Sequence, residues 1–177
     1  MQRDINSISF RDGFKYNFDL SISPKAGLIM AKNRNSEGRE IIKDREILGG
    51  LEEGVVLGWK EVSKVHKTRN GIYQRRGHLI SLLTDFGKIN PCYPDTYKGK
   101  NKIIYTGAGR RGNQKLDCFN QALLNAVKSG HAVPLFCKLS VGRWKFLGLW
   151  KVIRADYVFD NEQRRMIWQF LLEKVTS

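Results

Sequence analysis

A chain of 177 residues is long enough for one domain with an added segment, and its 41% hydrophobic residues favour a packed core over disorder. The formal net charge of +14 favours a polyanionic partner, and nucleic acid is the first class of such partners. No apolar stretch approaches about 18 residues and the segment after Met1 is polar, so we expect neither a membrane partner nor a secretory leader.

The N-terminal segment carries two hairpin patterns. Apolar residues alternate between Ile8 and Ile22 around an Asp12-Gly13 turn, which predicts a hairpin that ends at Pro24. A second hairpin pattern spans 27–42. We therefore expect an N-terminal hairpin extension over residues 1–46 and a second domain over residues 47–177.

A basic loop follows a glycine-rich segment and the apolar residues Trp59, Val62 and Val65. The loop runs from His66 to Arg76 with almost no acidic residue to balance it. A charge run of this kind is often a solvated face, and it is also what phosphate contacts require. Its basic residues, with Lys64 just before it, are Lys64, Lys67, Arg69, Arg75 and Arg76.

Two tyrosines flank the next loop. The apolar run from His78 to Leu83 predicts a buried strand, and the segment from Asn90 to Tyr97 contains too much proline for a strand or helix. Lysines then lead back to Tyr105, so Tyr93 and Tyr105 lie on either side of one loop.

The segment from Ile103 to Leu124 predicts a strand, a glycine turn and an amphipathic helix whose apolar residues begin at Leu116. Arg110 and Arg111 lie beside the predicted helix start, where cations and backbone N–H groups favour an anion. The alternative is a tight turn with solvated arginines. On local spacing the two interpretations are equally supported.

The last third predicts the strands of a curved sheet. Three apolar runs with β-branched or aromatic members span Val133–Leu139, Trp144–Ile153 and Met166–Leu172. We expect their tryptophans to lie in the core. The three cysteines share no C-x-x-C spacing and the histidines match no zinc pattern, so we expect reduced thiols, no metal and no other cofactor.

Several strings resemble the SRA (YDG) domain, the base-flipping reader of 5-methylcytosine. They are YTGAG from Tyr105, NQKLDCFNQAL from Asn113, Pro134 in an apolar run, and WKFLGLWKV from Trp144. Asn113-Gln114 corresponds to the family's DQ pair. The resemblance covers roughly residues 47–172. Phe146-Leu147-Gly148 replaces the tyrosine-aspartate-glycine signature, and the segment between the YTG turn and Gln114 is short.

This resemblance implies an α+β fold, with a curved antiparallel sheet or open barrel of the PUA-like kind and helices packed outside. It also implies a module that flips 5-methyl- or 5-hydroxymethylcytosine out of duplex DNA. We expect it to be the targeting module of a modification-dependent restriction endonuclease in a prokaryotic cytoplasm. No HNH, P-loop or P-D…(D/E)-x-K pattern is evident, so we expect no catalytic residue here and a nuclease in a partner or a further domain.

The resemblance also implies a base pocket, because a flipped cytosine needs flat apolar faces and an acceptor for its N4 amine. Asp95 lies one place short of the ungapped match, and Thr96 occupies that place. The pocket candidates are Tyr93, Asp95, Thr96, Tyr105, Thr106 and Gly107. The candidates for contacts with the DNA backbone and groove are Lys64, His66, Lys67, Arg69, Asn70, Arg75, Arg76, Arg110, Arg111 and Gln114.

Two other functions fit the same sequence. A PUA-like RNA-binding module would share the sheet and the basic surface without the two-tyrosine pocket. A magnesium-dependent nuclease would need acidic ligands, and Asp85, Asp95 and Asp117 are the candidates.

Overall fold

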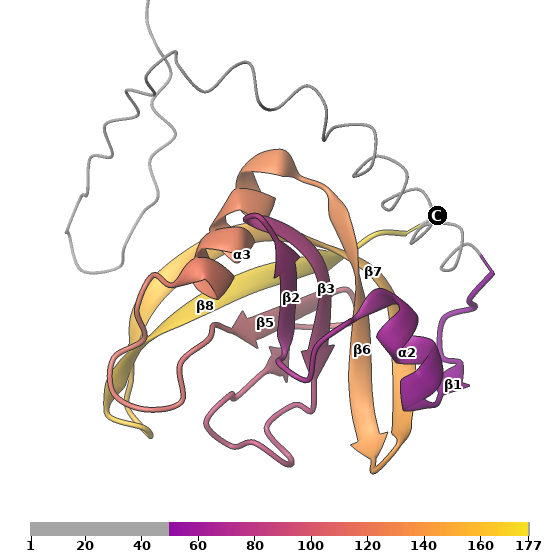
Figure 1. Cartoon of the computed structure of the whole chain (residues 1–177). Coiled ribbons are helices and arrows are strands. Elements are labelled where there is room, and N and C mark those ends of the chain that lie inside the picture. The colour runs from indigo at the N-terminus through magenta and orange to yellow at the C-terminus, as the bar shows by residue number, and fades with distance from the viewer. Residues whose placement is uncertain (1–49, 177) are drawn as a thin grey trace, which may run out of the picture.

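The computed structural model describes residues 50–176. In these residues eight strands form one sheet, and two helices pack against it (Figure 1). The two predicted hairpins within residues 1–46, and the domain boundary after them, lie outside the described residues. The elements are β1 (Val56–Leu57), α2 (Trp59–Val65), β2 (Ile72–Arg75), β3 (His78–Thr84), β4 (Thr96–Tyr97), β5 (Lys102–Thr106), α3 (Cys118–Ser129), β6 (Ala132–Ser140), β7 (Arg143–Asp160) and β8 (Arg165–Lys174).

The strands follow the order β2-β3-β6-β7-β8-β5-β4, and β1 pairs with β7 outside this path. The predicted α+β class and curved open sheet are therefore confirmed. The sheet is mixed, however, because β3 and β6 pair in parallel. The chain passes through β4, β5 and α3 before β6 begins, and such a crossover lets two strands run in the same direction.

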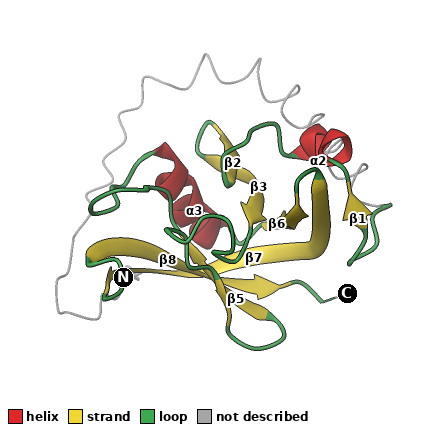
Figure 2. Cartoon of the chain, turned by 90° about the horizontal axis from the view of Figure 1, so that it is seen from below, coloured by secondary structure: helices red, strands yellow, loops and turns green. Residues whose placement is uncertain are grey.

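The long strand β7 links the two halves of the sheet. It pairs with β6 along its first part and with β8 along its second part. The register shifts between Val152 and Arg154, and a bulge of this kind increases local bending. Figure 2 shows β7 turning a corner, so that its first and second parts run in different directions and the sheet is curved.

The larger part of the core lies between the sheet and α3, and a second buried cluster, which includes Trp144, contains Val62 of α2. The buried residues include Leu123 of α3, Leu135 of β6 and Phe170 of β8, each 0% exposed. Trp150 is 2% exposed, and Trp144 and Trp168 are also buried, so the prediction that they are core residues is confirmed. Neither described helix is long and apolar enough to cross a membrane.

Helix α3 begins later than its apolar spacing predicts. Asp117 is the N-cap, and its carboxylate accepts hydrogen bonds from the N–H groups of Phe119 and Asn120. Leu116 therefore precedes the helix and is 41% exposed. Gly130 ends the helix in the left-handed conformation that glycine adopts without strain.

Two predicted loops contain strands. The second half of the loop from His66 to Arg76 is β2, because Ile72 is buried and pairs with Leu82. In the proline-rich loop, Thr96 and Tyr97 form β4 and pair with Ile104 and Ile103. Both strands lie at an edge of the sheet, where a single neighbour is enough to hold them.

Candidate functional site

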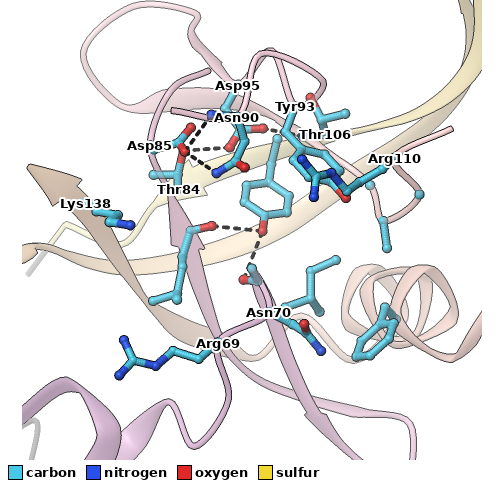
Figure 3. Close-up of a pocket in the computed structure, with 18 of the residues that line it drawn as sticks. Arg69, Asn70, Thr84, Asp85, Asn90, Tyr93, Asp95, Thr106, Arg110 and Lys138 are labelled. Carbon is cyan, nitrogen blue, oxygen red and sulfur yellow. Dashed lines mark hydrogen bonds between the residues drawn. The ribbon is translucent and has the colours of Figure 1, made fainter. Parts of the chain in front are cut away.

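A cavity of about 500 Å³ opens where the ends of β3 and β5 meet the glycine turn and the start of α3 (Figure 3). The loop from Arg69 to Ile72 forms another wall. Five of the six predicted pocket residues line this cavity: Tyr93, Asp95, Tyr105, Thr106 and Gly107. The structure therefore brings together residues from two loops and one strand that the sequence placed around a common site.

Asp95 is the buried carboxylate of the cavity. One oxygen accepts a hydrogen bond from the Thr84 hydroxyl at 2.6 Å, and the other accepts one from the Thr106 N–H at 2.7 Å. Burial raises the pKa of Asp95 from 3.8 to about 7, although the bonds from Thr84 and Thr106 favour its charged form. Each carboxylate oxygen has a second lone pair, so Asp95 can accept a further donor from a ligand.

Thr106 contributes a second polar group. Its hydroxyl lies close enough to Asp95 to lower the pKa of that carboxyl. It nevertheless makes no hydrogen bond of good geometry with any residue between 50 and 176. Buried polar atoms are usually paired. An unpaired hydroxyl in the wall of a cavity is therefore a suitable contact for a polar ligand.

The two tyrosines lie in different surroundings. Tyr105 is 3% exposed, and its hydroxyl lies 3.0 Å from the carbonyl oxygens of Gly71 and of Leu83. Burial raises its pKa well above the usual value, so the phenol stays neutral and fixed. Tyr93 is half-buried in the loop between β3 and β4 (Figure 3). Tyr105 thus forms a rigid wall, and Tyr93 offers the more accessible ring.

The structure does not bring Thr96 to the cavity. Thr96 is exposed in β4, next to the buried Asp95. Successive side chains of an extended segment point to opposite sides, so only one of these two neighbours can face the site. The prediction of Thr96 as a pocket residue is therefore wrong, and Asp95 occupies the position that faces inward.

The glycine turn is held by two buried amides. Asn120 Oδ1 accepts from the Ala108 N–H at 2.8 Å, and Asn120 Nδ2 donates to the Ala108 carbonyl at 3.0 Å. Gln114 Nε2 donates to the carbonyls of Gly107 and Gly109, and its Oε1 accepts from Trp168 N–H at 2.8 Å. The sequence predicts Gln114 as a DNA contact. It is 3% exposed with its amide used internally, so it supports the turn instead.

Gly107→Ala should destabilise the protein by about 1–3 kcal/mol, because an added methyl group overpacks a filled site. A Cβ atom there would lie 2.5 Å from Asn120 Oδ1 and 2.7 Å from Trp168 Cβ. Urea unfolding measures the effect. Gly50→Ala is the control, since its Cβ position has no heavy atom of residues 52–176 within 4 Å, and it should change the unfolding free energy by less than about 0.5 kcal/mol. Equal effects of the two substitutions would contradict this explanation.

His66 is a second predicted DNA contact that lies inside the protein. It is 0% exposed, and its ring nitrogens lie 2.8 Å from the Ser81 hydroxyl and 2.7 Å from the Asn70 carbonyl. Burial lowers its pKa from 6.5 to about 4, so the ring is neutral at physiological pH. His66 therefore fixes the loop that carries Asn70, and the prediction of a direct contact is wrong.

Three of the predicted DNA contacts lie at the cavity itself: Arg69, Asn70 and Arg110. The Arg69 guanidinium carbon lies 3.8 Å from the centre of the Trp59 ring, and this cation–π contact orients the side chain. Arg110 and Arg111 also line a neighbouring hollow beside Pro91 and Cys92. The other basic candidates do not line the cavity: Lys64, Lys67, Arg75 and Arg76.

Some residues of the site were missed by sequence reasoning. Lys138 of β6 lines the cavity and lies 5.8 Å from the centre of the Trp144 ring. Asn90 also lines it, and Asp85 accepts hydrogen bonds from its backbone and side chain at 3.1 and 2.7 Å. A lysine in an apolar strand and an asparagine before a proline carry no specific signal. Their role depends on the folding of distant segments.

The aspartates proposed for a magnesium nuclease have other functions in the fold. Asp85 holds its loop, Asp95 binds Thr84 and Thr106, and Asp117 caps α3. Within residues 50–176, no group of three His, Cys, Asp or Glu side chains could hold a metal ion. This geometry gives the nuclease hypothesis no support.

Comparison with known proteins identifies related domains. The family model of ScoMcrA-like SRA domains matches residues 62–177. No curated protein matches the sequence. The solved structure of the SUVH5 SRA domain with hemi-methylated CG DNA has a TM-score of 0.62 and 21% identity over 72% of this chain and 91% of that one.

Two further solved structures share the fold. The modification-dependent TagI restriction endonuclease has a TM-score of 0.60 and 24% identity, over 72% of this chain and 51% of that one. Arabidopsis thaliana SUVH6 has a TM-score of 0.56 and 21% identity, over 72% of this chain and 26% of that one. The region that the family model matches includes the strands and loops that surround the cavity.

Proposed function

This chain belongs to the ScoMcrA-like SRA domain family, and from this membership we propose that it binds duplex DNA containing a 5-modified cytosine and receives the flipped base in the cavity. The observation that carries the proposal is the buried carboxylate of Asp95 beside the unpaired Thr106 hydroxyl, in a cavity that Tyr93 and Tyr105 also line. A flipped base needs such a set of donors, acceptors and ring faces.

The chemistry of cytosine matches these groups. Its N4 amine donates hydrogen bonds, and the Asp95 oxygens have free lone pairs to accept one. The Thr106 hydroxyl pairs with another polar atom of the base edge. Tyr93 and Tyr105 replace part of the stacking that the base loses on leaving the duplex. Arg69, Arg110 and Lys138 supply positive charge around the cavity for the DNA backbone.

The proposal includes a role in restriction. TagI, part of which resembles this chain, is a modification-dependent restriction endonuclease, and the resemblance spans 51% of its length. We place the cleavage step in a separate nuclease domain or subunit that acts in a prokaryotic cytoplasm. The described residues then serve to find the modified site.

A binding comparison tests the function. The protein should bind a duplex with 5-methyl- or 5-hydroxymethylcytosine at least about tenfold more tightly than the same unmodified duplex, a difference of about 1.4 kcal/mol. Fluorescence anisotropy with labelled duplexes at one salt concentration measures both affinities. Single-stranded RNA of the same length is the third ligand. Equal affinity for modified and plain duplex would refute the proposal, and tighter binding of RNA would favour a PUA-like RNA-binding module.

Salt dependence provides the control for this experiment. The net charge of +14 predicts measurable binding of plain duplex. Log K should fall against log salt with a slope of about −0.9 for each phosphate neutralised. The ratio of modified to plain affinity should stay nearly constant, because contacts inside the cavity release few counterions. If the ratio of modified to plain affinity fell to about one at high salt, the preference would not arise in the cavity.

A further inference from the structure

Arg165, at the start of β8, connects the loop that carries Tyr93 with the glycine turn, and both segments contribute residues to the wall of the cavity. Its Nη2 donates to the carbonyl of Cys92 at 2.8 Å, and its Nη1 donates to the carbonyl of Gly109 at 2.7 Å and that of Gly112 at 3.2 Å. Cys92 precedes Tyr93, and Gly109 precedes Arg110. One side chain therefore holds the backbone beside a pocket tyrosine and beside a cation of the glycine turn.

The burial of Arg165 is unusual for a cation. The residue is 5% exposed. Its Nε donates to Gln163 Oε1 at 2.8 Å, and within residues 50–176 it forms no ion pair with a carboxylate. Burying a charge without an opposite charge is costly, so the carbonyl oxygens must compensate for the lost water. Since it is buried, Arg165 does not itself contact a phosphate.

The position of Arg165 is fixed from its own strand. In the pairing of β7 with β8, Arg165 is the register partner of Asp160. The next residue, Met166, donates its N–H to Asn113 Oδ1 and accepts from the Gln114 N–H, which joins β8 to the segment before α3. Its guanidinium therefore extends from a rigid element towards two less regular loops. Only arginine presents several donors in a fixed plane that can reach acceptors on both loops at once.

The held peptide groups are close to the pocket tyrosine. The Gly109 backbone lies near enough to the Tyr93 phenol to lower its pKa, against the larger effect of burial, which raises it. The Gly109 carbonyl is bound by both Arg165 and Gln114. A shift of the Gly109 peptide therefore also changes the surroundings of the Tyr93 phenol.

We propose that Arg165 is a positioning residue that sets the separation of these two loops and thereby the selectivity of the cavity for a modified base. This inference rests on the proposed function of the cavity. Small displacements of positioning groups produce large losses of selectivity. Plain duplex depends on exposed cations instead, so its affinity should not change.

Two substitutions separate a bridging role from a simple charge. Arg165→Lys keeps the charge but cannot reach both loops, and Arg165→Met removes the charge and the donors. Each should reduce the ratio of modified to plain affinity by about tenfold or more while plain duplex changes by less than about twofold. Arg143→Met, at an exposed arginine that begins β7, is the matched control and should keep the wild-type ratio. A wild-type ratio in Arg165→Lys would overturn the proposal.

A second measurement does not require DNA. Amide hydrogen exchange of the free protein should become faster in 88–93 and in 107–113 together when Arg165 is replaced by lysine, and should stay unchanged in Arg143→Met. Unchanged exchange in both segments would refute the bridging role, whatever the DNA preference. Absence of a preference in the wild type would refute the proposed function but leave this result interpretable. If Arg165→Met does not fold, Arg165→Lys decides both measurements. Gln163→Ala, which removes the acceptor of Arg165 Nε, then takes the place of Arg165→Met as the second variant.

Discussion

Tyr93→Ala should reduce the preference for modified duplex by about 1–3 kcal/mol, the usual value of one stacking contact between a base and an aromatic ring. Tyr93 lines the cavity and is half-buried, so its removal takes away a ring face without opening the core. The affinity for plain duplex should change by less than about twofold. Anisotropy titrations of modified and plain duplex, performed side by side, measure the ratio.

Tyr97→Ala is the matched control for this substitution. Tyr97 is 49% exposed, stacks on Phe86 and does not line the cavity. Its replacement removes the same number of atoms and should leave the preference unchanged. Tyr105→Ala is a poorer test because Tyr105 belongs to the hydrophobic core. If Tyr93→Ala kept the full preference for modified duplex, or if Tyr93→Ala and Tyr97→Ala reduced that preference equally, the base would have to bind elsewhere.

The strands were predictable because their cause is local. Runs such as His78–Leu83 and Met166–Leu172 consist mainly of apolar residues with β-branched or aromatic members, and such runs indicate buried strands without information from distant segments. The parallel pairing of β3 and β6 was not predictable in this way. It depends on the path of the chain through β4, β5 and α3, which no single segment encodes.

The pocket was predictable mainly through the family resemblance. That resemblance placed Tyr93, Asp95 and Tyr105 around one site, and the structure brings all three to the same cavity. It also carried over His66 and Gln114 as DNA contacts. Both are polar residue types that are seldom fully buried, and their burial becomes visible only with their partners, Ser81 and Trp168.

Arg165 shows the limit of reasoning from spacing. Its acceptors at Cys92 and Gly109 precede it by 73 and 56 residues, and they are backbone carbonyls that leave no trace in the sequence. An arginine beside Arg164 after a turn suggests a solvated charge. Its function depends on which loops the sheet brings to the start of β8.

Asp95 and His66 should give the protein two opposite pH dependences of stability that largely cancel. The Asp95 pKa is raised from 3.8 to about 7 in the folded state. Between about pH 4 and 7 the folded protein keeps this proton while the unfolded chain has lost it. The free energy of unfolding therefore falls as pH rises, by about 4 kcal/mol over the full interval. Above about pH 7 this contribution is constant.

His66 acts in the opposite direction. Its pKa is lowered from 6.5 to about 4, so between these values the unfolded chain binds a proton that the folded protein does not. The free energy of unfolding therefore rises with pH, by about 3 kcal/mol over the interval. In the wild type, the two slopes should nearly cancel between about pH 4 and 6.5.

Single substitutions should reveal each slope. Asp95→Asn, which resembles the protonated acid, should make the unfolding free energy rise by about 3 kcal/mol from pH 4 to 6.5, because His66 then acts unopposed. His66→Gln should make it fall by about 4 kcal/mol from pH 4 to 7. Urea unfolding at pH steps and constant ionic strength measures both curves, and the double variant supplies the baseline from all other groups. Each single variant should diverge from that baseline in its own direction. Parallel curves for the four proteins would show that the folded state holds neither a protonated Asp95 nor a neutral His66 through this pH range.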